Sequence, residues 1–144
     1  MRILVDTNVF LDFLLKRENF QIVSDFFTLS NKFRNTIYVT SISVRDIGYV
    51  VHKVFHSEEK AREMQHQVYS LCTKIIDITG DDTINSIFDA QNDFEDSLIK
   101  EAAEREMVDL IVTYNVKDFR KLGFPALTPK EINDIFIQQL KFAA

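Results

Sequence analysis

The sequence predicts an α/β fold, a three-layer α/β/α sandwich around a central, mostly parallel sheet of four to five strands. Short, unbroken apolar runs occur at residues 3–5, 37–39 and 110–112, and such runs are typical of strands buried on both faces. Between them lie longer segments whose apolar residues recur at helical spacing. Apolar strands that alternate with helices favour a parallel sheet with helices on both faces.

The first half of the chain contains two of the expected strands. Residues 3–5 form the first strand, and the apolar residues that follow up to Leu14 predict a helix. Phenylalanines spaced through residues 20–33 predict a second helix, and residues 37–39 predict the second strand. Residues 44–54 carry an apolar stripe, and Ser57 followed by acidic residues starts another helix that runs to residue 72.

The second half repeats the alternation of strands and helices. Residues 75–78 predict a third strand that ends at Gly80, and residues 84–88 predict a short helix. The segment at residues 92–106 predicts a helix that leads to the strand at 110–112, and residues 126–127 predict a short fifth strand. Thr128, Pro129 and Glu131 supply a cap, a first helical residue and a capping-box acid, so a last helix begins there.

Length and composition indicate one ordinary globular domain over residues 1–144. Hydrophobic residues make up 46% of the chain, and the one cysteine, Cys72, permits no internal disulfide, which fits a cytoplasmic protein. The sequence predicts neither a signal peptide nor a membrane span. The net charge is −5, so any nucleic-acid partner would have to be attracted by bound cations or by a local basic patch.

Acidic residues follow the expected strands at comparable positions. Asp6 ends the first apolar run, and the carboxyl ends of parallel strands meet at one edge of a sheet, where ligands bind. Several carboxylates brought together there would need a cation, and oxygen ligands suit Mg²⁺ or Mn²⁺. His52, His56 and His66 are scattered and are expected to be structural or surface residues. The other polar residues at this edge are Asp46, Asp93, Glu95, Asp96, Asn115 and Asp118.

Helix capping is an alternative explanation for these residues. The pairs Ser43 with Asp46, Asp93 with Asp96, and Asn115 with Asp118 are all variants of a capping box. Asp6 could likewise cap the first helix. Capping does not explain why Asp6 completes the set at the same edge, which favours a functional site.

Four segments resemble the acidic segments of PIN-domain nucleases, in the same order: VDTNVFLDFLL, the turn at 41–46, DFEDSLIKEAAE and VTYNVKDF. The resemblance is greatest to single-domain, VapC-like toxins. It implies an endoribonuclease that depends on Mg²⁺ or Mn²⁺, and a small antitoxin protein as its partner. Asp6 matches the first acid of the family and Asp96 the third. Asp46 stands where many members have glutamate, and Asn115 where many have aspartate, with Asp118 three residues further on.

The residues and the resemblance together define an expected site. Asp6, Asp46, Asp96 and Asp118 are the expected catalytic residues, and the cation would be held by Asp6, Asp96, Asp118, Asn115 and Asp93. Hydrogen bonds from neighbouring side chains are expected to orient these ligands, and basic side chains to attract the RNA backbone. The orienting residues are Thr7, Asn8, Ser43 and Thr113; the basic residues are Arg45, Lys117, Arg120 and Lys121.

Two other functions fit the same sheet edge. A PIN-like module that binds RNA or protein without cutting would account for Asp46 and Asn115. A phosphotransfer enzyme or receiver domain fits less well, because residue 8 is Asn where a D-x-D motif needs Asp and because no acidic pair closes the first strand.

The first helix also predicts a homodimer. Only Asp12 is polar among residues 9–15, whereas a helix that faces one core needs only an apolar stripe. Either a second copy covers the remaining apolar side, or the phenylalanines of the next helix do so within the chain. The resemblance favours the dimer, because VapC-like members commonly pair.

Overall fold

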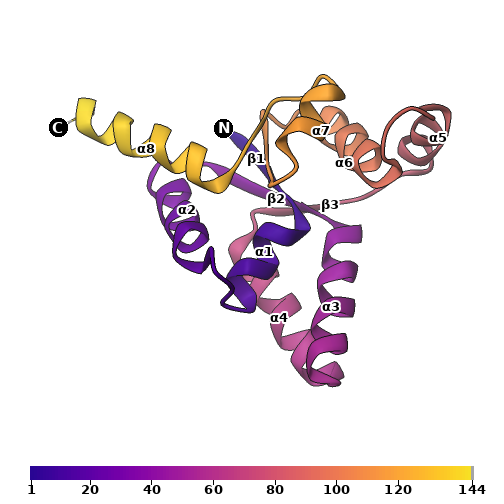
Figure 1. Cartoon of the computed structure of the whole chain (residues 1–144), viewed down its shortest axis with the longest axis horizontal. Helices are drawn as coiled ribbons and strands as arrows, with labels where there is room; N and C mark the ends of the chain where they lie inside the picture. The colour runs from indigo at the N-terminus through magenta and orange to yellow at the C-terminus, as the bar shows by residue number, and fades with distance from the viewer. Residues whose placement is uncertain (144) are drawn as a thin grey trace.

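The structure, a computed structural model, describes residues 1–143, which form a five-stranded sheet and eight α-helices (Figure 1). Its strands are β1 (Arg2–Val5), β2 (Thr36–Thr40), β3 (Lys74–Ile76), β4 (Leu110–Val112) and β5 (Ala126–Leu127). They pair in the order β3-β2-β1-β4-β5, and every pair is parallel. The predicted α/β sandwich with a parallel sheet is therefore confirmed.

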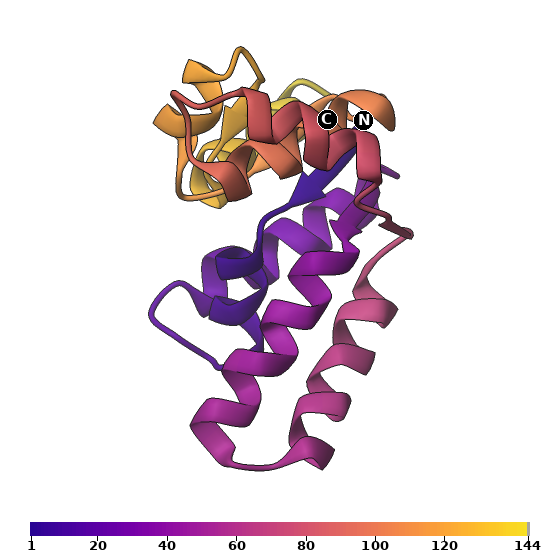
Figure 2. The ribbon, with the colours of Figure 1, turned by 90° about the vertical axis from the view of Figure 1, so that its right-hand side faces the viewer.

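Alternate residues of the strands serve two separate cores. Ile3, Val5 and Val39 face a core shared with α1 (Thr7–Leu14), α2 (Phe20–Lys32), α3 (Ser41–Phe55), α4 (Glu58–Leu71) and α8 (Pro129–Ala143). Leu4 and Ile111 face the other core, with α6 (Phe94–Arg105) and α7 (Val116–Lys121), while α5 (Gly80–Phe88) packs on α6. Helices α3 and α4 reach away from the sheet as a hairpin (Figure 2). Among residues 1–143, no helix has the length and hydropathy needed to cross a bilayer.

Helix α1 is covered within the chain, so the prediction that its apolar side forms a dimer is wrong. Leu11 and Leu14 are 2% and 6% exposed. Phe13 stacks on Phe20 with ring centroids 5.3 Å apart, and it meets Phe27 of α2 edge-on at 5.5 Å. The phenylalanines of α2 thus bury the second side of α1, which is the alternative that the sequence left open.

Hydrogen-bonded caps fix where several helices begin. At α8, Thr128 Oγ1 accepts from the backbone N–H of Glu131, and Glu131 Oε1 accepts from that of Thr128, as the sequence predicted. Helix α5 begins at Gly80, four residues before its first apolar residue, because Thr79 and Asp82 form a reciprocal capping box. Strand β3 accordingly ends at Ile76 and not at residue 78.

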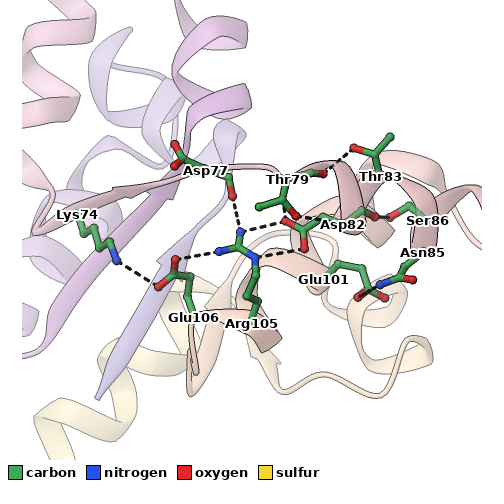
Figure 3. Close-up of polar contacts among 10 residues, drawn as sticks. All are labelled: Lys74, Asp77, Thr79, Asp82, Thr83, Asn85, Ser86, Glu101, Arg105 and Glu106. Atoms are coloured by element: carbon green, nitrogen blue, oxygen red, sulfur yellow. Dashed lines mark hydrogen bonds and ion pairs between the residues drawn. The ribbon is translucent and has the colours of Figure 1, made fainter.

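The end of α6 is tied to the start of α5 through Arg105 (Figure 3). Its guanidinium donates to both carboxylate oxygens of Asp82, at 3.3 Å and 2.9 Å, and to the carbonyl of Asp77. Burial would raise the pKa of Asp82, but the hydrogen bonds from Arg105 and Thr79 hold it below its usual value. Glu106 pairs with both Arg105 and Lys74. These bonds fix α6 against β3.

We expect Asp82→Ala to lower the free energy of unfolding by about 1–3 kcal/mol, because it removes half of a capping box and the two hydrogen bonds that Arg105 donates to Asp82. Asp81→Ala is the matched control, since Asp81 is exposed in the same turn, and its effect should stay within about 0.5 kcal/mol. Urea unfolding of the two variants measures the difference. Equal stabilities would show that the Arg105–Asp82 pair does not hold α5 in place.

Candidate functional site

A cleft of about 160 Å³ opens at the carboxyl edge of the sheet. Its walls come from the segments that follow β1, β2, β3 and β4 and from the start of α6, so residues far apart in the sequence meet there. This is the edge at which the sequence predicted a site. The lining residues are Asp6, Thr7, Asn8, Thr40, Ile42, Ser43, Asp46, Ile78, Glu95, Asp96, Leu98, Ile99 and Asn115.

Asp6 lies between β1 and α1 and is 8% exposed. Its Oδ1 accepts from the backbone N–H of Thr7 at 2.8 Å, which caps α1, and its Oδ2 accepts from Thr113 Oγ1 at 2.8 Å. Thr113 Oγ1 in turn accepts from the backbone N–H of Asn115 at 3.0 Å. Asp6 thus caps α1, as the capping alternative proposed. It also faces the cleft, and its carboxylate is held by Thr113, the residue that follows β4.

Hydroxyl groups connect the starts of α1 and α3. Thr7 Oγ1 donates to Ser43 Oγ at 2.8 Å, and Thr40 caps α3 by accepting from the backbone N–H of Ser43 at 3.1 Å. Since Thr40 is the cap, the proposed capping box of Ser43 with Asp46 is wrong. Asp46 lies further along α3 and lines the cleft, so capping does not account for its position.

Asp96 enters the cleft from the first turn of α6 and is 8% exposed. Its backbone N–H donates to Asp93 Oδ1 at 3.0 Å, so Asp93 is the cap of α6, as the capping alternative proposed. Within residues 1–143 the structure gives no hydrogen-bond donor and no ion pair to the Asp96 carboxylate. Asp93 is exposed and does not line the cleft, although it was predicted as a metal ligand.

The electrostatics of the cleft disfavour two free carboxylates. Burial raises the pKa of Asp6, although the hydrogen bonds from Thr113 and Thr7 oppose this rise. Burial and then the negative charges of Asp93, Asp6, Asp118 and Glu95 raise the pKa of Asp96 to about 7. Each carboxylate is therefore costly to ionise without a counter-charge, and a cation between them would supply one.

Asn115 and Asp118, at the start of α7, have different surroundings. The Asn115 side chain makes no capping bond and lines the cleft, so the proposed capping role of this side chain is wrong. Asp118 is exposed and lies in a shallow hollow beside the cleft, with Asp93, Asp96 and Lys121. The structure thus brings Asn115 into the cleft with Asp6 and Asp96, and it leaves Asp118 close enough to affect the charge on Asp96.

The basic residues predicted to attract RNA have different surroundings. The Arg45 guanidinium pairs with Asp46 Oδ1 at 3.1 Å at the mouth of the cleft, with its side chain 79% exposed. Lys117 and Lys121 lie on α7, where Lys117 is exposed. Arg120 donates to the carbonyl of Ala126 at 3.0 Å, so its guanidinium helps to hold α7 against β5.

The donor set of the cleft fits a hard divalent cation. Among residues 1–143, no three His, Cys, Asp or Glu side chains are already spaced as metal ligands. Asp6 and Asp96 are nevertheless two buried carboxylates that face one space, and the Asn115 amide lines the same space. Carboxylate and amide oxygens are the ligands that Mg²⁺ and Mn²⁺ prefer. Asp6, Asp96 and Asn115 are therefore the residues best placed to hold such an ion.

Two features of the cleft had no assigned role in the sequence interpretation. Glu95 lines the cleft beside Asp96; it was counted among the acids, and its place in the first turn of α6 was the available signal. Ile42, Ile78 and Ile99 form an apolar part of the wall. Apolar residues in strands and helices usually belong to the hydrophobic core. No pattern in the sequence therefore distinguishes these three isoleucines, which line the cleft, from core residues.

Solved structures with the same fold include several toxin–antitoxin proteins. VapBC2 from Rickettsia felis, bound to a DNA fragment from its promoter, is 21% identical with a TM-score of 0.68, over 89% of this chain and 98% of that chain. Mycobacterium tuberculosis VapC20, a sarcin-ricin loop cleaving toxin, is 11% identical with a TM-score of 0.65, over 85% and 95%. A toxin–antitoxin complex from Klebsiella pneumoniae is 23% identical with a TM-score of 0.63, over 88% and 97%.

Sequence comparisons give the family. No curated protein gave a significant match to the chain. The profile of the PIN domain matches residues 2–117, which include β1 to β4 and every residue of the cleft. Because this match covers most of the chain, and the sheet order and the acidic cleft lie within it, the protein belongs to the PIN domain family.

Proposed function

We propose that this PIN-domain protein is a divalent-cation-dependent endoribonuclease, and that it acts as the toxin of a toxin–antitoxin pair in the cytoplasm. The observation that carries the proposal is the pair of buried carboxylates, Asp6 and Asp96, which face one cleft and whose pKa values are both raised. Such a pair is costly to keep unless a cation is bound between its members. All of residues 1–144 are proposed to act as one domain.

In this proposal Asp6, Asp96 and Asn115 hold Mg²⁺ or Mn²⁺, and Asp46, Glu95 and Asp118 add negative charge around it. When bound, the cation would lower the pKa of a water molecule and neutralise charge that develops on the scissile phosphate. The Thr113 hydroxyl holds the Asp6 carboxylate in place, and the Asp93 cap fixes the turn that carries Asp96. Arg45, Lys117 and Lys121 would attract the RNA backbone from two sides of the cleft.

The proposed substrate and partner draw on the related structures. VapC20 is described as a sarcin-ricin loop cleaving toxin, which supports RNA as the substrate here. The Rickettsia felis and Klebsiella pneumoniae proteins were solved with their toxin–antitoxin partners, which supports a small antitoxin. A short antitoxin gene immediately upstream of the gene for this chain would add independent support.

Incubation with a set of structured RNAs tests the proposed activity directly. We expect cleavage with Mn²⁺ or Mg²⁺ and none with EDTA, and Asp6→Asn serves as the inactive control. The competing function is a PIN-like module that binds RNA or protein without cutting, which the shorter Asp46 and the uncharged Asn115 favour. RNA binding without cleavage by the wild-type protein at any divalent concentration would decide for that module.

We also propose a homodimer, now through α5 and not through α1. Ile84, Ile87 and Phe88 share one face of α5 and are 52%, 61% and 84% exposed. A symmetric dimer would bury the same face of both copies. Light scattering should give a dimer mass for the wild type and a monomer mass for Ile87→Glu with Phe88→Glu. A monomeric wild-type protein would refute the dimer, and a dimeric variant would refute this interface.

A further inference from the structure

A buried carboxylate outside the cleft, that of Asp12 in α1, is bonded to the segment that carries Asn115. Asp12 is 8% exposed, and it does not line the cleft. Tyr114 Oη donates to Asp12 Oδ2 at 2.6 Å, between residues 102 apart in the sequence. A buried carboxylate is costly unless other groups donate hydrogen bonds to it or carry a counter-charge. The bond from Tyr114 therefore helps to keep Asp12 inside the fold.

The other partners of Asp12 come from the loop between α1 and α2. Asn19 Nδ2 donates to the same oxygen, Asp12 Oδ2, at 3.3 Å. The Arg17 guanidinium lies 3.8 Å from Asp12 Oδ1, and the backbone N–H of Arg17 donates to the carbonyl of Asp12. Asp12 thus connects this loop, helix α1 and the turn that follows β4.

The turn after β4 consists of Thr113, Tyr114 and Asn115, which make different contacts. Thr113 donates its hydroxyl to Asp6, and its backbone N–H bonds to β5, so its place does not depend on Tyr114. Asn115 lines the cleft, and its side chain makes no capping bond that would fix it. The Tyr114 hydroxyl therefore ties the residue next to Asn115 to α1, the helix that Asp6 caps.

We propose that Asp12 and Tyr114 are positioning residues, whose hydrogen bond sets the place of Asn115 relative to Asp6 and thereby the fit of the cleft to a divalent cation. Neither of the two lines the cleft, so both act through Asn115. This inference rests on the proposed function, because Asn115 is a proposed ligand of the cation. The place of one ligand matters because Mg²⁺ demands a nearly ideal octahedral geometry.

Calorimetric titration with Mn²⁺ tests the proposal without RNA and without cleavage. Tyr114→Phe removes only the hydroxyl, and we expect it to weaken Mn²⁺ binding about tenfold, the lower end of the range for residues that orient metal ligands. Tyr69→Phe is the matched control, because Tyr69 is 68% exposed on α4 and does not line the cleft. It should leave the Mn²⁺ affinity unchanged. Circular dichroism and urea unfolding in EDTA check that each variant folds.

Asp12→Asn separates the effect of position from that of charge. Tyr114 and Asn19 both donate to Oδ2 of Asp12, so the single carbonyl oxygen of an asparagine can accept both bonds. We expect Asp12→Asn to bind Mn²⁺ as tightly as the wild type, and Asp12→Ala to bind it as weakly as Tyr114→Phe. If Asp12→Asn bound as weakly as Asp12→Ala, the charge of Asp12 would matter and not its bond with Tyr114, and the proposal would be wrong.

An Asn115→Ala background distinguishes positioning from a general structural role. Adding Tyr114→Phe to Asn115→Ala should change the Mn²⁺ affinity by less than about twofold, because the ligand that Tyr114 positions is already gone. An equal loss of affinity with and without Asn115 would overturn the proposal, since it would mean that Tyr114 only supports the fold.

Two further results would also overturn it: equal Mn²⁺ affinities of Tyr114→Phe and Tyr69→Phe, or a wild-type protein that binds no Mn²⁺. Failure of the proposed function would look different. The wild type and the variants would then bind Mn²⁺ in the expected order, while the wild type would cleave no RNA.

Discussion

Asp6→Asn is expected to lower divalent-dependent RNA cleavage by at least roughly 100-fold, since even residues that only orient metal ligands account for 10- to 100-fold. The amide keeps the volume of the carboxylate, and its oxygen can still accept from the Thr7 N–H that caps α1. It lacks the charge that would hold a cation. The variant should therefore fold normally, as circular dichroism would show, while gel assays with Mn²⁺ detect little product.

Asp134→Asn is the control for this experiment, because Asp134 is an acid on α8 that pairs with Lys130 and does not line the cleft. Its cleavage rate should equal that of the wild type. If Asp6→Asn cleaved RNA as fast as Asp134→Asn, Asp6 would have no part in the reaction, and the assignment of the cleft as the active site would fail.

The convergence of the acids could be predicted from sequence because it follows from topology. In a parallel sheet every strand that is followed by a helix ends at the same edge, so Asp6, Asp46 and Asn115 had to approach one another. The short apolar runs also predicted the order of elements, since a strand buried on both faces tolerates few polar residues. Neither inference needed any knowledge of side-chain contacts.

The roles that sequence left open depend on single hydrogen bonds. Asp93 caps α6, as the capping alternative proposed. Helix α3 is capped by Thr40 and not by Ser43 with Asp46. A shift of three residues in the start of α3 decides whether Thr40 or Ser43 is the cap. The prediction that a second copy covers α1 failed for a related reason, because the apolar pattern of α1 is the same whether α2 or a second copy covers it. The bidentate bond of Arg105 to Asp82 joins residues 23 apart, which no local pattern indicates.

Asp96→Asn is expected to have opposite effects on activity and on the stability of the metal-free protein. Cleavage should be lost, because Asp96 is a proposed ligand of the cation. The carboxyl of Asp96 has a pKa of about 7 in the folded chain against a usual value of 3.8, so folding favours its protonated form. The protonated Asp96 carboxyl stabilises the folded chain fully below the pKa that this group has in the unfolded chain. This stabilisation is lost as the pH rises through about 7. Asparagine carries no charge and escapes this loss.

In EDTA, the free energy of unfolding of Asp96→Asn should therefore exceed that of the wild type by on the order of 2 kcal/mol at about pH 8, and by far less at about pH 5.

Added Mn²⁺ should make the wild type the more stable of the two proteins at the higher pH. A ligand that binds only the folded protein stabilises it, by about 2.7 kcal/mol at one hundred times its dissociation constant, and the variant lacks one of the two carboxylates that would bind it. Urea unfolding across this pH range measures both effects. A constant difference between the two proteins from about pH 5 to about pH 8 would mean that neither burial nor the neighbouring carboxylates raise the pKa of Asp96. Equal stabilisation of both proteins by Mn²⁺ would mean that Asp96 is not a ligand.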